Sequence, residues 1–311
     1  MTTIRGDLPD LFRGSEAVAE GLLTARQLRG GYVRQVLRDV YRPAWVPLTV
    51  DMQCRAAILI SPSSALVTGL SLATWRGVPL AEPGHDVEMI VPVADHFGPV
   101  KGVRVRAVSR MSATRSTLGG EPVADSLRMG FDLAARRPLE MSVAYLDAAA
   151  HAGVLDLPRL RRWLDDRHDN DVEHVRLAAS LADARAESVP ESRCRVRLTL
   201  AGIAVEPQFV VTDRAGGYIE RADLAIPELK IAISYDGRWH EAGEQKEKDR
   251  RRWTKYRRAG WEIVHVTAST LRRHAQLEIE VRAAISEQLA RRPPTSPTPH
   301  FRGKAPSGVR A

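Results

Sequence analysis

Cysteine is scarce in this sequence, which contains two cysteines among 311 residues. Cys54 and Cys194 lie far apart, so we expect neither the disulfide framework of a small secreted domain nor a CxxC zinc site. Two isolated thiols suit a reducing cytoplasm. Residues 1–12 lack an apolar segment and carry Asp7 and Asp10, so we expect no secretory signal peptide there.

Long hydrophobic runs and internal repeats are also missing. The most apolar stretch, residues 56–72, is interrupted by Pro62 and several serines, so we expect no membrane span. No segment repeats at a fixed period, which excludes solenoid architectures. We therefore expect a soluble cytoplasmic protein with no membrane partner.

Basic residues, by contrast, are in excess. The formal net charge is +8 and the isoelectric point is about 9.8. A basic surplus favours polyanionic partners, with nucleic acid ahead of an anionic membrane face. The hydrophobic fraction of 44% and the charged fraction of 27% are ordinary for globular proteins, and the length predicts two or three domains.

Composition and turn residues divide the chain into four parts. Residues 1–50 predict helices beginning at Ser15 and Thr24 and then a strand before Pro43, which is compatible with a winged-helix-like unit and also with many unrelated domains. Residues 51–185 form a mixed α/β middle region. Residues 186–291 form a C-terminal module, and residues 292–311, rich in Pro, Ser, Gly and Arg, predict a disordered basic tail.

The middle region offers elements but no catalytic spacing. Its predicted helices are 53–60, 63–75, 124–135, 141–152 and 157–166, and its predicted strands are 87–92 and 100–108. The loop pairs His85–Asp86 and Asp95–His96 fit solvated residues better than a metal site. Residues 165–171 (DDRHDND) lack the Gly and Glu of an EF-hand and predict a polar linker.

The C-terminal module has the most informative pattern. Ser188 to Glu191 is a capping box that starts a helix ending before Gly202. Predicted strands follow at 205–212, 218–225 and 230–236, then a charged helix to Ala259, a strand at 261–267, and a helix capped by Ser269 that ends near Ala290. This order predicts a restriction-endonuclease-like core, in which helices flank a mixed sheet.

Carboxylates in this module have a spacing that suits phosphodiester hydrolysis. Magnesium binds oxygen ligands, and it can both neutralise developing charge and activate a water. Asp223 and Asp236 end two neighbouring strands joined by a tight turn, so their carboxylates can meet if the strand faces agree. His240 follows and could polarise a water or protonate the leaving oxygen.

The helix expected over 241–258 has a basic surplus, with eight basic residues against four acidic ones. Such a surplus suits contact with DNA phosphates. The candidate DNA-binding residues in and beside this helix are Arg238, Lys248, Arg250, Arg251, Arg252 and Lys255. The surplus could also be a solvated face stabilised by pairs such as Glu244–Lys248, with Trp253 and Tyr256 on the core side.

Four short runs carry a resemblance to a known family: 191–192 (ES), 221–224 (RADL), 232–240 (AISYDGRWH) and 259–261 (AGW). Together they resemble the Vsr-like endonuclease domain of the PD-(D/E)XK superfamily. The runs 39–43 (DVYRP) and 68–71 (TGLS) resemble, more loosely, the N-terminal part of AbiEi-type antitoxin regulators. The resemblance is to a bacterial group that joins the two parts.

The resemblance implies a site and a cofactor. It implies metal-binding roles for Asp223 and Asp236, a catalytic role for His240, a supporting role for Glu191, and Mg²⁺ or Mn²⁺ as the ion. One position departs from the group, because Ser234 stands where most members have Glu. The repair endonucleases of the wider family also lack an acid there, so Ser234 is compatible both with an active metal site and with one that has lost its metal.

Each candidate has an ordinary structural alternative. Glu191 is explained equally well by the helix cap, Asp236 by a turn before Gly237, and His240 by a helix start. Asp223 is harder to explain away, because a carboxylate on an apolar strand needs a partner.

Two functions follow, and the first is favoured. The chain is either a Mg²⁺-dependent DNA endonuclease or nickase, or a catalytically inactive, AbiEi-like DNA-binding regulator that keeps the nuclease fold as a platform. Ser234 favours the second, whereas the joint presence of Asp223, Asp236 and His240 favours the first. A partner toxin or a homodimer is compatible with both, and a scaffold without DNA contact is a third alternative.

Overall fold

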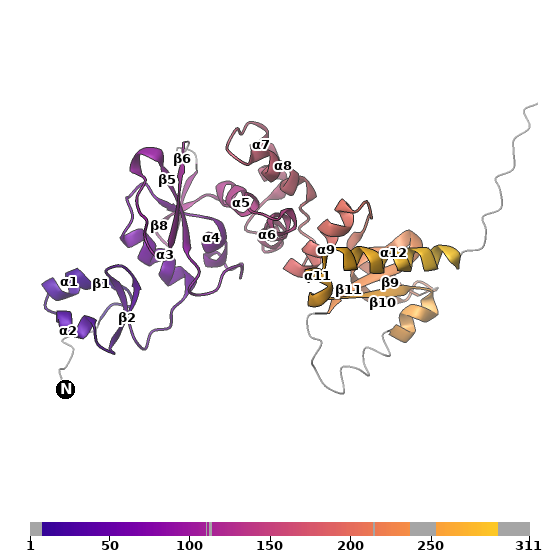
Figure 1. The fold of residues 1–311 in the computed structure, drawn as a ribbon, viewed down its shortest axis with the longest axis horizontal. Coiled ribbons are helices and arrows are strands. Elements are labelled where there is room, and N and C mark those ends of the chain that lie inside the picture. The colour runs from indigo at the N-terminus through magenta and orange to yellow at the C-terminus, as the bar shows by residue number, and fades with distance from the viewer. Residues whose placement is uncertain (1–7, 110, 112–113, 214, 237–252, 292–311) are drawn as a thin grey trace, which may run out of the picture. The chain divides into compact units, whose positions relative to one another are not determined.

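The computed structural model of the protein describes residues 8–109, 111, 114–213, 215–236 and 253–291 (Figure 1). The chain divides into two compact units, unit 1 (Met1–Ile203) and unit 2 (Ala204–Ala311). Both combine helices with strands, so the expected mixed α/β class is confirmed. Among the described residues, no helix has both the length and the apolar character needed to cross a bilayer.

Unit 1 begins with a small antiparallel sheet in the order β1-β3-β2. Its elements are β1 (Phe12–Arg13), α1 (Gly14–Ala19), α2 (Ala25–Leu28), β2 (Val33–Leu37) and β3 (Val40–Pro43). Thr24 starts α2 as expected: its hydroxyl accepts the Gln27 N–H, and the Gln27 side chain accepts the Thr24 N–H at 2.7 Å.

Two details of this region differ from the prediction. The single strand expected before Pro43 is a hairpin, because Asp39 adopts a left-handed turn conformation with φ of 61°. Ser15 does not cap α1, which follows Arg13 without a side-chain cap. Its hydroxyl donates to the Asp39 carboxylate instead, at 2.6 Å, and so ties α1 to the hairpin turn.

The main sheet of unit 1 has five strands in the order β6-β5-β4-β8-β7. These are β4 (Leu66–Val67), β5 (Val87–Pro92), β6 (Val103–Val108), β7 (Arg115–Leu118) and β8 (Glu121–Ala124). β5 pairs with β6, and β4 with β8, in parallel, whereas the pairs β4–β5 and β7–β8 are antiparallel. The helices are α3 (Val50–Leu59), α4 (Gly69–Trp75), α5 (Ser126–Ala134), α6 (Leu139–His151), α7 (Leu157–Asp165), α8 (Val172–Leu181) and α9 (Val189–Leu200), with the 3-10 turn η1 (Val93–Asp95) after β5.

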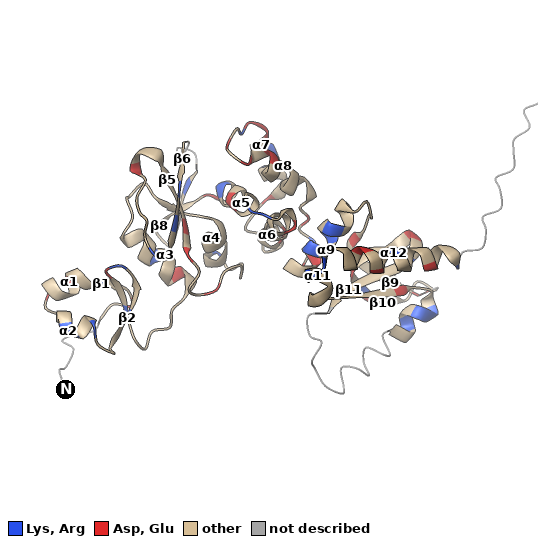
Figure 2. Ribbon diagram, in the orientation of Figure 1, with Lys and Arg blue, Asp and Glu red and all other residues tan. Residues whose placement is uncertain are grey.

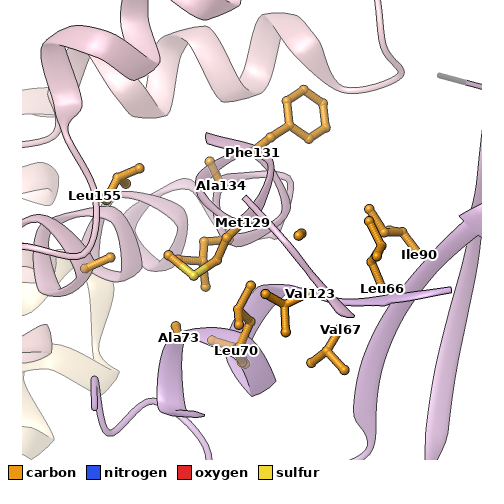
Figure 3. Packing of buried hydrophobic residues seen from close by; sticks show 14 of the residues in the cluster. Leu66, Val67, Leu70, Ala73, Ile90, Val123, Met129, Phe131, Ala134 and Leu155 are labelled. Carbon is orange, nitrogen blue, oxygen red and sulfur yellow. The ribbon is translucent and has the colours of Figure 1, made fainter. Parts of the chain in front are cut away.

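An apolar core joins this sheet to its helices (Figure 3). Leu66 and Ile90 from the sheet and Met129 and Phe131 from α5 are at most 1% exposed. Each such side chain contributes about 1.5–3 kcal/mol by leaving water. This core, rather than any one contact, holds the unit together.

Three expectations for the middle region are wrong in part. The helix expected over 63–75 begins only at Gly69, because Leu66 and Val67 form the short buried strand β4. Strands β7 and β8 and helix α8 were not expected. The polar linker expected over 165–171 is part of the fold, because Asp169 accepts hydrogen bonds from Arg128 at 3.2 Å and Arg167 at 2.8 Å.

A buried ionic network lies between the main sheet and α5. The Arg128 and Asp132 side chains are 1% and 4% exposed, and Arg128 donates to Asp132 at 2.7 Å. Asp132 also accepts from the Thr68 hydroxyl at 2.7 Å and from Arg106. Burial, reinforced by repulsion from Arg106, lowers the pKa of Arg128 to about 10.

Unit 2 is built on a four-stranded sheet in the order β12-β11-β10-β9. The strands are β9 (Glu206–Thr212), β10 (Tyr218–Ile226), β11 (Ile231–Asp236) and β12 (Glu262–Thr267), with the 3-10 turn η2 (Pro227–Leu229) between β10 and β11. β9, β10 and β11 form an antiparallel meander, and β12 pairs with β11 in parallel. The sheet is therefore mixed, as expected for this part of the chain.

Helices cover both faces of this sheet (Figure 1). One face carries Ala225 and Ala232, which pack with Tyr256 and Ala259 of the helical segment 253–259. On the other side lie α11 (Ala268–Arg272) and α12 (His274–Ala290). Tyr256 is 1% exposed, which confirms the core position expected for it.

The end of unit 2 and the place of α9 differ from the prediction. Thr267, not Ser269, caps the next helix by accepting the Thr270 N–H, and two helices follow where one was expected. Ser188 does cap α9 as expected. However, α9 belongs to unit 1, where Arg195 pairs with the buried Asp147 of α6 at 2.7 Å, whereas we expected it in the C-terminal module.

Candidate active site

Asp223 lies in the second half of β10 and is half-buried. β10 pairs with β11 so that Leu224 faces Ile233, which makes the next residues, Asp223 and Ser234, neighbours on one face. The Asp223 carboxylate accepts the Tyr235 backbone N–H at 2.8 Å and lies 3.4 Å from the Ser234 hydroxyl. The carboxylate is therefore fixed at the point where the β10–β11 pairing ends.

His265 extends this arrangement to a third strand. The parallel register of β11 and β12 pairs Ser234 with His265, just as it pairs Ala232 with Ile263. Ile263 packs against the Ala225–Ala232 cluster, so His265, two residues on, lies on the same face. Asp223, Ser234 and His265 thus form one row of polar side chains across β10, β11 and β12, here called the polar row.

The helical segment 253–259 covers this face of the sheet. The Trp253 and His265 rings lie 4.7 Å apart between centroids, tilted by 57°. Lys255, Arg257 and Arg258 of the same segment are exposed, and the ribbon of this segment is partly blue in Figure 2, where Lys and Arg positions are blue. Of the expected DNA-binding residues, Lys255 is thus placed beside the polar row's face.

The remaining predicted residues of the module are only partly described. Asp236 ends β11, where its backbone pairs with Thr267, but its side chain is outside the described part of the structure. The others that fall outside the described residues are Arg238, His240, Lys248, Arg250, Arg251 and Arg252. Their predicted roles stay predictions.

Glu191 lies in unit 1, in the first turn of α9, and not in the unit of Asp223. Its carboxylate accepts the Ser188 hydroxyl at 2.7 Å, and its N–H donates to the Ser188 oxygen at 3.4 Å. The Ser188 N-cap accounts for these contacts, and the Glu191 carboxylate also accepts the Glu187 N–H at 3.3 Å, so Glu191 takes part in the helix start as one of its two alternatives requires.

The loop pairs of the middle region are not built as metal centres. Asp95 and His96 are exposed, and His85 lies 3.9 Å from the Glu88 carboxylate. In the part of the chain that the structure describes, no three His, Cys, Asp or Glu side chains are grouped so as to hold a metal ion.

Sequence reasoning missed His265. Its neighbours Val264 and Val266 are buried, so the histidine stands out as the polar residue inside the apolar run 263–266. That pattern gives no partner, however. Only the parallel register of β11 and β12 shows that His265 lies beside Ser234.

No protein-family model matches the chain. Two Mycobacterium tuberculosis proteins, Uncharacterized protein MT2308 (strain CDC 1551 / Oshkosh) and Uncharacterized protein Rv2248 (strain ATCC 25618 / H37Rv), are each 27% identical to it over 229 residues. Those residues cover 73% of this chain and 79% of each relative. The crystal structure of the RV2827C protein from Mycobacterium tuberculosis matches 66% of this chain and 79% of its own, with 16% identity and a TM-score of 0.37, a likeness too distant to carry an argument.

Proposed function

We propose that unit 2 is a Vsr-like, metal-dependent DNA endonuclease or nickase that hydrolyses phosphodiester bonds. The observation that carries the proposal is the position of Asp223. Its half-buried carboxylate is held by the Tyr235 N–H on the sheet face that the basic segment 253–259 covers. An acid fixed in this way beside exposed cations suits a site where a phosphate group and a divalent ion meet.

The residues present fit magnesium in chemistry. Carboxylate oxygens are the ligands that Mg²⁺ prefers, and Asp223 on β10 and Asp236 on the neighbouring strand β11 would hold it. When bound, the ion would supply charge neutralisation and an activated water. Ser234 lacks the charge of a third carboxylate and interacts with Asp223 instead, so its contribution is to orient that acid.

His240 and the basic residues complete the proposal. We assign proton transfer to His240, and phosphate contact to Arg238, Lys248, Arg250, Arg251, Arg252 and Lys255. Glu191 supports the site if its role extends beyond the helix cap. A DNA substrate is compatible with the cytoplasmic location expected from the sequence.

The second candidate function is an AbiEi-like DNA-binding regulator without catalysis. A specific observation in unit 1 favours it: Arg34 of β2 and Arg42 of β3 are direct cross-strand neighbours in the hairpin. Like charges in that position repel, and DNA phosphates would relieve the repulsion. The exposed Tyr32 and Trp45 flank the same hairpin. A partner toxin or self-association belongs to this hypothesis.

A plasmid-nicking assay separates the two functions. Supercoiled DNA and Mg²⁺ or Mn²⁺ are incubated with one of three proteins: wild type, Asp223→Ala or Asp223→Asn. The asparagine side chain keeps an oxygen that can accept the Tyr235 N–H, so the Asp223→Asn variant should keep its fold. Asp213→Asn is the matched control, because Asp213 is an exposed turn acid of the same unit that accepts the Ala215 and Gly217 N–H groups at 2.8 Å.

We expect nicking that requires metal, that both Asp223 variants lose by at least about a hundredfold, and that Asp213→Asn retains. If wild type binds DNA without cleaving it under any metal condition, the endonuclease proposal is wrong and the regulator remains. Equal cleavage by wild type and the Asp223 variants would exclude Asp223 as the centre of the site.

A further inference from the structure

Unit 1 carries a group of arginines on one face of its main sheet, apart from the candidate site of unit 2. Arg104 and Arg106 lie on β6, and the parallel register places Arg104 directly beside Glu88 of β5. Residues two apart on a strand share a face of the sheet, as do residues paired across neighbouring strands. On that face Arg106 pairs with Asp132 of α5, and Arg136, which follows α5, pairs with Glu88. We call Arg104, Arg106 and Arg136 the arginine cluster.

The acids beside the cluster are engaged below the surface. Glu88 is buried, and its two oxygens accept from the Leu70 N–H, at 2.8 Å, and from Arg136. Asp132 is held within the buried ionic network by Arg128, at 2.7 Å. These carboxylates therefore fix the positions of the arginines that reach them.

Positive charge remains in excess around the cluster. Asp169 adds one acid and Arg167 one base to the network, through their pair at 2.8 Å. The connected side chains and Arg104 together comprise five arginines and three acids, a surplus of two positive charges: Arg104, Arg106, Arg128, Arg136 and Arg167 against Glu88, Asp132 and Asp169. A surplus of this kind attracts an anion to the exposed side of the cluster.

The cluster also keeps unused hydrogen-bond donors. Arg104 is exposed, and within the described part of the chain no carboxylate pairs with it. Arg106 has a side chain that is 43% exposed and pairs with Asp132 through Nη2. The Arg136 Nε is buried and has no hydrogen-bond partner among the residues that the structure describes. A guanidinium has five N–H donors in a planar fork, so each of these arginines can still bind an oxyanion.

The arrangement along an edge strand suits an extended polyanion. β6 is at one end of the sheet, so its outer side is open, and Arg104 and Arg106 are spaced by about 6.6 Å along it. This spacing is on the scale of neighbouring phosphates in a nucleic-acid strand. Basic residues on an edge strand also prevent pairing with another chain. That role explains Arg104, but it does not require Arg136 beside the same edge.

We propose that the arginine cluster binds backbone phosphates of DNA, which gives unit 1 a DNA contact of its own. Arg104 and the remaining guanidinium nitrogens of Arg106 would donate to phosphate oxygens, and Arg136 would add positive charge behind them. The inference rests on the proposal that DNA is the partner of this chain. It holds whether unit 2 cleaves DNA or the chain only binds it.

The test measures binding, its salt dependence and no cleavage. A fluorescein-labelled DNA duplex is titrated with the full-length protein in EDTA at several salt concentrations, and anisotropy gives the Kd. Arg104→Gln removes a charge that has no ionic partner in the described structure, so the fold should be unaffected, and Arg104→Lys keeps the charge. Arg162→Gln is the matched control, because Arg162 is an exposed arginine of α7 in the same unit.

Each phosphate contact contributes about 0.9 to the slope of log Kd against log salt concentration. Arg104→Gln should therefore lower this slope by about 0.9 and raise the Kd about eightfold at about 0.1 M salt. Arg104→Lys should restore most of the slope, and Arg162→Gln should change the Kd by less than about twofold.

The outcomes separate this inference from the nuclease proposal. If Arg104→Gln matches Arg162→Gln in Kd and slope, the inference is overturned, even where the wild type nicks DNA. If Arg104→Gln weakens binding in a protein that cleaves nothing, the inference is supported while the nuclease proposal fails. A wild type that does not bind the duplex overturns both.

A second measurement needs no variant. The wild-type protein is treated with phenylglyoxal, which modifies arginines, with and without the duplex, and the modified peptides are quantified by mass spectrometry. We expect DNA to protect Arg104 and Arg106 and to leave Arg162 as reactive as before. Equal modification of Arg104 with and without DNA overturns the inference. Equal protection by polyglutamate would show that the cluster binds carboxylates as well, and would overturn its assignment to DNA.

Discussion

Removing the Asp132 carboxylate should destabilise unit 1 more than removing any exposed acid. Asp132 accepts two hydrogen bonds from the buried Arg128, at 2.7 and 3.2 Å, and one from Thr68 at 2.7 Å. In Asp132→Ala, Arg128 would keep only the Asp169 carboxylate, at 3.2 Å, as an ionic partner. Breaking a buried pair in this way costs about 3–5 kcal/mol, because an uncompensated charge stays out of water.

For a folding unit of this size, that loss lowers the midpoint of thermal unfolding by about 6–20 °C, at about 2–4 °C per kcal/mol. Differential scanning calorimetry of the full chain measures it. Arg137→Ala is the control, because it breaks an exposed pair with Asp171 at 3.3 Å, whose side chains are 59% and 48% exposed, and should cost less than about 1 kcal/mol.

A double variant tests the reasoning from the other side. Arg128→Met with Asp132→Leu removes both buried charges of the pair, so the uncompensated Arg128 charge of Asp132→Ala is absent, although Thr68 loses its acceptor and Arg106 its ionic partner. The double variant should therefore be more stable than Asp132→Ala. The reasoning is refuted if Asp132→Ala unfolds at the same temperature as Arg137→Ala, or if the double variant is the least stable of the three.

Two further predictions concern α9 and the buried thiol of α3. Glu191→Gln keeps an acceptor for the Ser188 hydroxyl, so nicking and thermal stability should match wild type if Glu191 only caps the helix; a loss of nicking at unchanged stability would show a catalytic role. Burial raises the pKa of the Cys54 thiol from 9.0 to about 12, so Cys54 should resist a thiol reagent at pH 8 in the native protein and react once the protein is unfolded, as counted by the absorbance of the released thiolate. Rapid labelling of native Cys54 at pH 8 would contradict its burial. Because the pKa is raised on folding, the thiol's contribution to the free energy of unfolding is complete below pH 9.0 and is lost as the pH rises towards about 12.

Elements set by local chemistry were predictable from the sequence. The caps at Thr24 and Ser188 and the alternating residues of β10 and β11 lie where the sequence places them, because their partners are within a few residues. The sequence predicts helix where strand β4 lies, since a short, fully apolar run has no periodicity that separates the two structures. Its strand state comes from pairing with β5 and β8, which are distant in the chain.

In the candidate site, too, local features could be predicted from the sequence, whereas contacts between distant segments could not. Asp223 could be found because a carboxylate interrupts an apolar strand, and Ser234 because it departs from a known motif. The position of His265 beside Ser234 could not be predicted, because the register between β11 and β12 depends on packing between segments that are distant in the sequence. The assignment of α9 to unit 1 was likewise hidden, since it follows from the Arg195–Asp147 pair across two helices.

The parallel pairing of β11 with β12 has a consequence for the order in which unit 2 folds. The meander β9–β10–β11 closes through short turns, whereas β12 reaches its place only after the intervening residues 237–261. Loop closure costs more entropy for the longer connection, so the hairpins form first and β12 adds to their edge late. Asp223 and Ser234 therefore meet early, and His265 joins them only when the sheet is complete, so that a nascent chain holds two of the three residues of the polar row until its last strand has been made.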